Sequence, residues 1–256
     1  MDMSHLCVLL TGAGESVGRV AAEKFQAAGA AVHICDIRPD AVEATLGDNP
    51  EMSGSVCNVG DAGEVEALFE DAIGRMGRVD ILVNCVGIAG PSAPLEEITD
   101  EDWHTSMQVN ATGMFYTMKR AIPGMKKRRY GSIVNFSSAS TLTRLPNRTA
   151  YVVSKYAVEG LTKNAARELG PYNVRCNAIL PGAINNERLN TVLRRVATQK
   201  GMSLEDFEKE ALQYISMRSK IEPSELADAV LFLASDEAPH ITGVLMEISG
   251  GQEWEA

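Results

Sequence analysis

Seven short runs of aliphatic and β-branched residues recur along the chain, and segments of helical character separate them. The runs lie at residues 6–10, 31–35, 55–57, 81–83, 132–136, 174–179 and 244–248. Near-continuous apolar strands that alternate with amphipathic helices are typical of a parallel sheet, because helices then cover both of its faces. The pattern predicts a doubly wound α/β fold of about seven strands, with residues 1–256 forming a single domain.

One segment, at about residues 185–218, interrupts this alternation. It contains two helix-like stretches, at 187–200 and 204–217, where a single connecting helix would be enough. The segment follows the carboxyl end of a predicted strand, which is where open α/β sheets bind their ligands. We expect it to form a substrate lid, with structural padding as the alternative.

The charge balance argues against nucleic acid and membranes as partners. With 24 Lys and Arg against 34 Asp and Glu, the net charge is −10, and such a field repels phosphate backbones and anionic lipids. No stretch of the sequence approaches the ~18 to 20 apolar residues that cross a bilayer. The one basic run, at 126–129, falls where a helix should end, and cations stabilise that end of a helix. A nuclear signal or a nucleic-acid patch is the alternative for this run.

Cysteine usage indicates a reducing compartment. The chain has no C-x-x-C pair, and each of its five cysteines lies in or beside an apolar run: Cys7, Cys35, Cys57, Cys85 and Cys176. We expect buried thiols and no bound metal, since the four histidines are also scattered. The first predicted strand begins close to the first residue, which leaves no room for a signal peptide. A cytoplasmic protein is the expectation.

The first predicted strand runs directly into a glycine-rich turn and then into an alanine-rich helix. The turn reads Thr11-Gly12-Ala13-Gly14-Glu15-Ser16-Val17-Gly18. Glycines let the backbone turn tightly against a pyrophosphate, whose charge the amides at the helix N-terminus stabilise. This predicts a dinucleotide site on a Rossmann-like sheet, with an ordinary tight turn as the alternative. The residues expected to contact the cofactor are Gly12, Glu15, Ser16, Val17 and Gly18.

The second strand ends at Asp36, eighteen residues beyond Gly18, and Ile37 follows it. This is close to the spacing at which a carboxylate accepts hydrogen bonds from the adenosine ribose of a dinucleotide. The carboxylate would face the 2′-phosphate of NADP, and like charges at close range are unfavourable, so NAD is the predicted cofactor. NADP is the alternative, because Arg38 could turn back to meet a phosphate.

The third and fourth strands also end in residues suited to a nucleotide site. The third ends at Cys57-Asn58-Val59 and the fourth at Asn84-Cys85-Val86-Gly87. In this type of sheet, the carboxyl edge of these strands holds the adenine and its ribose. The residues expected to line the site are Asn58, Val59, Asn84, Val86 and Gly87, with ordinary turn positions as the alternative.

A hydroxyl, a phenol and an ammonium follow at spacings that suit proton transfer. Tyr151 and Lys155 are four residues apart, and Ser138 lies thirteen positions before the tyrosine. On one helix, Tyr151 and Lys155 would project from the same face. The ammonium would stabilise the phenolate, which suits the phenol to general acid/base work on an alcohol or carbonyl. By itself the pair could be two ordinary helix residues, but beside a nucleotide site it indicates an oxidoreductase.

With the glycine turn, Asp36, Asn84, Asn110, Ser138, Tyr151 and Lys155 in this order, the sequence resembles the short-chain dehydrogenase/reductase family, in its single-domain branch. The resemblance covers residues 6–251. In the family's T-G-x-x-x-G-x-G turn, Ser16 stands where the middle glycine is usual. The family's N-N-A-G reads Asn84-Cys85-Val86-Gly87, and its Pro-Gly reads Pro181-Gly182. Asn186 replaces a threonine that often contacts the nicotinamide carboxamide.

The resemblance implies a role for each matching residue. Tyr151 would be the acid/base, Ser138 would hydrogen-bond the substrate oxygen, and Lys155 would hold the nicotinamide ribose. Asn110 would place a water that links Lys155 to solvent, although a locally bonded helix residue is the alternative. Pro181 and Ile184 would complete the cofactor site.

The implied activity is hydride transfer between NAD and a secondary alcohol or ketone, such as a polyol or a hydroxy acid. A NADP-dependent ketoreductase, such as a 3-oxoacyl thioester reductase, shares the same catalytic set and is the alternative. A catalytically inactive nucleotide-binding protein is a further alternative.

Arginines near the expected site raise the question of an anionic substrate. They are Arg144 and Arg148 after Ser138, and Arg188, Arg194 and Arg195 in the predicted lid. Guanidinium groups pair well with carboxylate, sulfonate or phosphate groups. Solvated surface arginines are the alternative.

The resemblance also implies dimers or tetramers built on the helices that carry Asn110 and Tyr151. Small residues there would allow close helix approach, or would suit a helix–sheet contact: Ala157, Gly160, Ala165 and Ala166. Trp254 could pack at such an interface or against the core.

Overall fold

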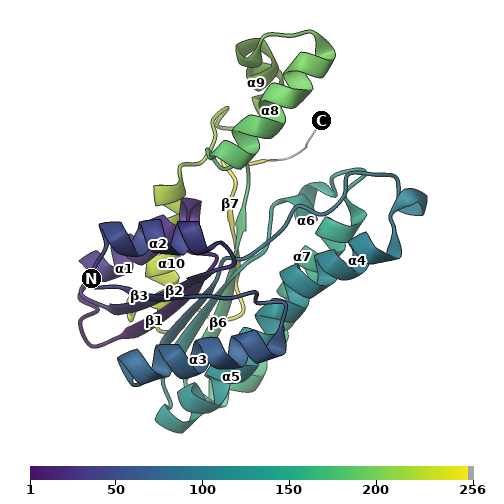
Figure 1. Cartoon of the computed structure of the whole chain (residues 1–256). Coiled ribbons are helices and arrows are strands. Elements are labelled where there is room, and N and C mark those ends of the chain that lie inside the picture. Colours follow the sequence, from purple (N-terminus) through teal and green to yellow (C-terminus); the bar gives the residue numbers. More distant parts are fainter. Residues whose placement is uncertain (253–256) are drawn as a thin grey trace.

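The structure of the chain is a computed structural model that describes residues 1–252, apart from the side chain of Arg188. Its seven strands form one sheet in the order β3-β2-β1-β4-β5-β6-β7, in which all neighbours run parallel (Figure 1). The strands are β1 (Cys7–Thr11), β2 (Ala31–Asp36), β3 (Ser53–Val56), β4 (Ile81–Asn84), β5 (Gly131–Phe136), β6 (Val174–Pro181) and β7 (Leu245–Ile248). The chain winds from β1 out to β3 and then returns to β4, so the strand order reverses between β1 and β4. This confirms the predicted doubly wound fold, and ligands of such folds bind at this reversal.

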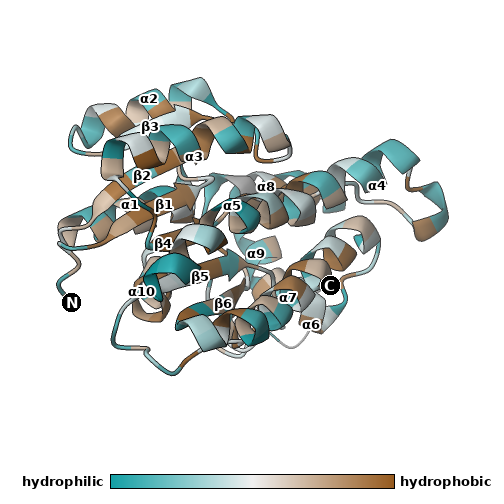
Figure 2. Ribbon diagram, turned by 90° about the horizontal axis from the view of Figure 1, so that it is seen from below, coloured by the Kyte–Doolittle hydropathy of each residue, from teal (hydrophilic) through white to brown (hydrophobic). Residues whose placement is uncertain are grey.

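Helices cover both faces of the sheet. On one side are α1 (Ser16–Ala27), α2 (Pro39–Asp48) and α10 (Pro223–Ala234), and on the other are α3 (Ala62–Met76), α5 (Gly113–Arg128) and α7 (Thr149–Leu169). The helices that flank the sheet carry both hydrophilic and hydrophobic stretches (Figure 2). Each helix can therefore bury one side and expose the other.

Strand β1 shows why the strands of this sheet are continuous apolar runs in the sequence. Val8 and Leu10 point into a core with Phe25 of α1, whereas Leu9 points into the opposite core with Leu68 of α3. All five residues are fully buried. Because successive side chains of a strand alternate between faces, a sheet buried on both sides needs an apolar residue at every position.

Strand β3 begins two residues earlier than the predicted run at 55–57. Ser53, which lies outside the predicted run, is in the strand together with Ser55. Their hydroxyls hydrogen-bond the two ring nitrogens of His33 on β2, at 2.8 and 2.9 Å. The buried histidine thus gives two polar residues partners inside the sheet.

The segment at 185–218 contains α8 (Glu187–Lys200) and α9 (Leu204–Leu212). The two helices pack through their own cluster of Leu193, Ala197 and Phe207 and stand away from the sheet (Figure 1). The second helix ends five residues before the predicted position 217. Beyond it the chain pairs with the C-terminal segment, since Ile215 forms an antiparallel bridge with Gln252. The lid role of α8 and α9 stays a prediction.

Shorter elements complete the fold. They are α4 (Asp100–Met107), a π-helical turn η2 (Gln108–Thr112), α6 (Ser140–Thr143) and the 3₁₀ turns η1 (Leu95–Glu97) and η3 (Gly170–Tyr172). As predicted, the basic run at 126–129 ends a helix, because α5 stops at Arg128 and Arg129 adopts a left-handed conformation. All five cysteines are free thiols, and only Cys85 is not fully buried. Among residues 1–252, no helix has the length and apolar character that crossing a bilayer requires.

Candidate active site

The turn after β1 is so tight that a side chain at Gly12 or Gly18 would collide with the backbone. Gly12 has a left-handed φ of +65°, and a Cβ there would lie 3.0 Å from the backbone nitrogen of Val86. At Gly18, a Cβ would lie 2.2 Å from the carbonyl oxygen of Gly12. The first amides of α1 therefore stand directly over the end of β1. Such a turn has the geometry that holds a pyrophosphate, so these residues fit a dinucleotide.

Asp36 lies beside this turn at the end of β2. One oxygen of its carboxylate accepts a hydrogen bond from the Gly14 amide at 3.1 Å, and the other accepts one from the Arg38 amide at 3.1 Å. These bonds fix the carboxylate at the glycine turn, where the sequence predicted a ribose contact. Ile37 is 62% exposed, so an apolar surface lies beside the carboxylate.

The side chain of Arg38 is held by two carboxylates. It donates to Asp40 at 2.7 Å and to Glu15 at 2.9 Å. Hydrogen bonding to Asp40, together with the charges of Asp40 and Glu15, raises the pKa of the Arg38 guanidinium above its usual range. With Asp36, three carboxylates and one guanidinium stand at this end of β2, so the local balance is negative.

Tyr151 and Lys155 lie on the same face of α7, as predicted. The Lys155 Nζ is 5.8 Å from the centre of the phenol ring and donates to the Phe136 carbonyl at 2.8 Å. The guanidinium carbon of Arg148 is 5.2 Å from the same ring, and its Nη2 donates to the Ala89 carbonyl at 2.8 Å. Two cations thus lie within 6 Å of the centre of the phenol ring.

Ser138 lies on the loop after β5, and a buried carboxylate ties this loop to α7. The Ser138 Oγ accepts from the Ser140 amide at 3.2 Å. On either side of it, the hydroxyls of Ser137 and Thr141 donate to Glu159 at 2.8 and 2.7 Å. Glu159 was not predicted, and the sequence signal for it is its place four residues after Lys155, on the helix face that carries Tyr151 and Lys155. It connects the loop of Ser138 to the helix of Tyr151.

Asn110 is buried in the π-helical turn η2, a distortion that is frequent at functional sites. Its Oδ1 accepts from the Ile88 amide at 2.7 Å, and its Nδ2 donates to the Ile88 carbonyl at 3.0 Å and to the Ser154 hydroxyl at 2.9 Å. These partners are far away in the sequence, so local bonding does not explain the residue. Asn110 joins the end of β4 to α7, beside Lys155.

Gly87 brings the β4 edge close to the same group. A Cβ at Gly87 would lie 3.0 Å from Lys155 Nζ and 3.5 Å from Asn110 Oδ1. Only a residue without a side chain leaves Lys155 in its observed position. Burial raises the pKa of the neighbouring Cys85 thiol to about 12, against the opposing effect of the Lys155 charge. Cys85 is therefore a neutral thiol near neutral pH.

Three other residues predicted for the cofactor site have side chains that are buried in the protein. The Asn84 side chain points into the protein, donating to Asn135 at 2.9 Å and accepting from Thr117 at 2.7 Å. Asn84 can face a cofactor only with its backbone. Val59 is buried against Gly113, and Val17, in the first turn of α1, is buried in the core beneath that helix.

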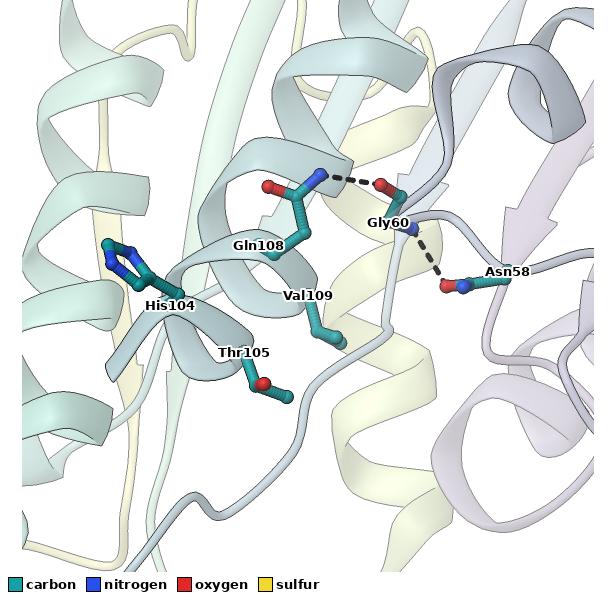
Figure 3. Close-up of a pocket in the computed structure, with 6 residues that line it drawn as sticks. All are labelled: Asn58, Gly60, His104, Thr105, Gln108 and Val109. Carbon is teal, nitrogen blue, oxygen red and sulfur yellow. Dashed lines mark hydrogen bonds between the residues drawn. The ribbon is translucent and has the colours of Figure 1, made fainter. Parts of the chain in front are cut away.

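A recess of about 350 Å³ opens beside the end of β3 (Figure 3). It is lined by Asn58, Gly60, His104, Thr105, Gln108 and Val109. The Gln108 side chain donates to the Gly60 carbonyl at 2.6 Å, and the Gly60 amide donates to Asn58 at 3.0 Å. The loop with Asn58 is thus fastened to η2, at the edge where the sequence predicted the adenine.

Two of the residues that depart from the family pattern contact each other. Ser16 has a φ of +51°, and its hydroxyl accepts a hydrogen bond from the Asn186 side chain at 3.3 Å. Ile184, two residues earlier, bridges to Ile221, and the Pro181 carbonyl accepts from the Ala139 amide. The loop after β6 therefore lies between the glycine turn and the loop of Ser138.

The four predicted arginines whose side chains are described differ in their surroundings. Arg144 and Arg195 are exposed, and Arg194 pairs with Glu187 at 2.6 Å. The side chain of Arg188 lies outside the described part of the structure, as does Trp254. Among the four arginines whose side chains are described, Arg148 contacts Tyr151.

Comparison with known proteins agrees with this fold. A family profile described as enoyl-(acyl carrier protein) reductase matches residues 12–253. An uncharacterised oxidoreductase of Thermotoga maritima is 37% identical over 253 residues, which cover 98% of each chain. The 7α-hydroxysteroid dehydrogenase of Escherichia coli K12 is 32% identical over 96% of this chain and 93% of that enzyme. The 3-oxoacyl-[acyl-carrier-protein] reductase of T. maritima is 34% identical over 98% of this chain and 99% of that enzyme.

The protein therefore belongs to the short-chain dehydrogenase/reductase family and is an oxidoreductase of that family. Solved structures agree. Levodione reductase has a TM-score of 0.91 with 29% identity, covering 99% of both chains. NAD⁺-bound xylitol dehydrogenase has a TM-score of 0.88 with 29% identity, covering 95% of this chain and 97% of that one. Actinorhodin polyketide ketoreductase with NADPH has a TM-score of 0.92 with 28% identity, covering 99% of both chains. Nicotinamide cofactors of both kinds thus occur among its structural neighbours.

Proposed function

We propose that the protein is a NAD-dependent dehydrogenase that transfers a hydride between the nicotinamide and a secondary alcohol or ketone, such as a polyol or a hydroxy acid. The observation that carries the proposal is the Tyr151 phenol flanked by Lys155, at the carboxyl edge of the sheet and beside a turn shaped for a dinucleotide. When bound, the nicotinamide supplies the hydride chemistry. The residues of the chain supply orientation and a path for the proton.

In this proposal Tyr151 takes the proton of the alcohol hydroxyl, and Ser138 hydrogen-bonds the same oxygen. Lys155 favours the negative charge that Tyr151 needs as a base, and it is fixed by the Phe136 carbonyl. Glu159 and Asn110 hold the loops on either side of the phenol. Such positioned acid/base groups typically contribute about 10²- to 10⁴-fold to a rate.

The preference for NAD over NADP rests on the residues at the end of β2. Asp36 is fixed at the glycine turn by the Gly14 amide. Arg38, the residue that could accept a 2′-phosphate, is held by Glu15 and Asp40. A 2′-phosphate would meet the Asp36 carboxylate, and Arg38 would have to break two ion pairs to compensate.

The experiment is a screen of secondary alcohols, polyols, hydroxy acids and hydroxysulfonates with NAD and with NADP, read by the absorbance of the reduced nicotinamide. The proposal expects turnover with NAD on members of this panel. Turnover of 3-oxoacyl thioesters with NADPH, faster than any NAD reaction, would instead assign the activity of the 34% identical reductase. Tight NADH binding without turnover on any substrate would indicate an inactive nucleotide-binding protein.

We propose more specifically that the substrate is an anion, because Arg148 lies against the Tyr151 ring. An Arg148→Ala variant would then lose its discrimination between hydroxy acids and neutral alcohols. Equal selectivity in the variant and the parent would contradict the proposal of an anionic substrate, but it would not affect the dehydrogenase proposal.

We also propose that the protein self-associates through α5 and α7. Phe115, Val153 and Tyr156 on these helices are 45%, 37% and 43% exposed, and exposed large apolar side chains favour an interface. Of the small residues considered, Ala165 and Ala166 are buried against the sheet, where they make a helix–sheet contact. Size-exclusion chromatography with light scattering tests the proposal, and a dimer or tetramer that dissociates in Phe115→Asp would support it. A monomeric parent protein would overturn it.

A further inference from the structure

Ser16 and Asn186 are 170 residues apart in the chain, and each replaces the residue that the family pattern has at its position. Ser16 is held at φ +51°, in the left-handed region where glycine is favoured. A side chain there costs about 1 kcal/mol or more in backbone strain. The strained serine places a hydroxyl at the glycine turn, and that hydroxyl is bonded by Asn186.

Both ends of the Asn186 side chain are engaged. Its Oδ1 accepts from the Leu189 amide at 2.9 Å, which makes it the N-cap of α8. Its Nδ2 donates to the Ser16 hydroxyl at 3.3 Å. One amide side chain therefore connects the first turn of α8 to the first residue of α1.

The Ser16 hydroxyl still has a proton to give while it accepts from Asn186, because a hydroxyl has one O–H and two lone pairs. Ser16 begins α1, whose amides face the point where an anion binds at a helix N-terminus. An oxygen of a bound pyrophosphate would take this proton in a hydrogen bond. Hydrogen bonds in a chain polarise and strengthen one another, so the Asn186–Ser16 bond would tighten at the same time.

We propose that Ser16 and Asn186 form a hydrogen-bond relay that holds α8 against the cofactor turn when a dinucleotide pyrophosphate is bound. Both are then positioning residues for the segment over the substrate side of the site. The inference rests on the proposed function, because it needs a dinucleotide in the glycine turn. The helices α8 and α9 share an apolar cluster of their own. A hydrogen bond that fixes the start of α8 is therefore expected to stabilise both helices together.

The test is hydrogen–deuterium exchange of the α8 amides, with and without saturating ADP-ribose, in the parent protein and in Ser16→Gly and Asn186→Thr. ADP-ribose carries the pyrophosphate but no nicotinamide, so a carboxamide contact cannot contribute. Each variant installs the family's usual residue. Gly accepts the left-handed φ and Thr still caps a helix, so both variants are expected to fold.

The relay predicts that ADP-ribose slows α8 exchange in the parent protein by about 5-fold or more, and by less than about 2-fold in either variant. Asn190→Thr is the matched control: it lies on α8 and bonds Lys220 but not Ser16, so slowing should persist. AMP, which lacks the second phosphate, should slow exchange little in any of them.

Equal slowing of α8 in the parent and in both variants would overturn the relay, as would no slowing in a parent protein that binds ADP-ribose. In either case turnover with NAD would leave the proposed function standing. A parent protein that binds neither NAD nor ADP-ribose by calorimetry would overturn the proposed function and the relay together.

Discussion

Lys155 Nζ lies 5.8 Å from the centre of the Tyr151 ring, one helical turn away on α7, and Lys155 is only 3% exposed. Burying an ammonium group is unfavourable unless its hydrogen bonds are satisfied. The Phe136 carbonyl satisfies one of them at 2.8 Å. In the low-dielectric interior, the electrostatic interaction between this ammonium and the phenol is stronger than it would be in water. A buried cation in this position is expected if the phenol acts as an acid or base.

The close approach of Gly87 to Lys155 predicts a large effect from a single methyl group. In Gly87→Ala, the added Cβ would lie 3.0 Å from Nζ, so the ammonium must shift by a few tenths of an ångström beside Tyr151. We expect kcat/KM to fall about 10- to 100-fold, since small misplacements of such groups are costly. Steady-state kinetics with NAD and the best alcohol measures this.

Gly74→Ala is the control, because a Cβ at that position in α3 meets nothing within 4 Å. It should keep full activity and gain about 0.5 to 1 kcal/mol in free energy of unfolding. Equal activities for the two alanine variants would contradict the steric explanation.

Cofactor preference should respond to the carboxylate of Asp36. Asp36→Ala removes the charge that would repel a 2′-phosphate and also frees the Gly14 amide. The ratio of kcat/KM for NAD to that for NADP should fall at least about 10-fold, which corresponds to about 1.4 kcal/mol. Glu43→Ala, which removes an exposed carboxylate from α2, controls for net charge and should leave the ratio unchanged. An Asp36 variant that keeps the parent ratio would remove this residue from cofactor selection.

His33 predicts how stability depends on pH. Burial lowers the pKa of this histidine to about 4, with Asp71 opposing the shift and Arg75 adding to it. The unfolded value near 6.5 is higher, so below about pH 6.5 the unfolded chain binds a proton that the folded protein does not. The contribution of His33 to stability is therefore complete above that pH and is lost as the pH falls toward 4.

Between pH 7.5 and pH 5 this group alone should lower the free energy of unfolding by about 2 kcal/mol. Urea unfolding at the two pH values measures the change in the parent, in His33→Gln and in His240→Gln, whose histidine is exposed. The His33 variant should lose this part of the pH dependence, and the His240 variant should keep it. Identical pH dependence in all three would show that His33 is not the group responsible.

The sequence predicted most features that depend on local pattern. Alternating apolar runs predicted the sheet, the glycine turn predicted the β1–α1 connection, and the four-residue spacing predicted that Tyr151 and Lys155 share a helix face. Features that depend on contacts between distant segments were not predictable in this way. Glu159 finds its partners on the loop after β5, and Ser53 is a strand residue because of His33. The direction of the Asn84 side chain likewise depends on Thr117 and Asn135.

The most direct test of the proposed function compares Tyr151→Phe with the parent protein, measuring turnover of the best alcohol with NAD and, separately, the dissociation constant of NADH. The proposal expects kcat to fall by at least about 10²-fold, because the variant has no phenolic proton to transfer, while NADH binds within about 3-fold of the parent. A Tyr151→Phe enzyme that retains most of the parent kcat would contradict the proposed role of Tyr151.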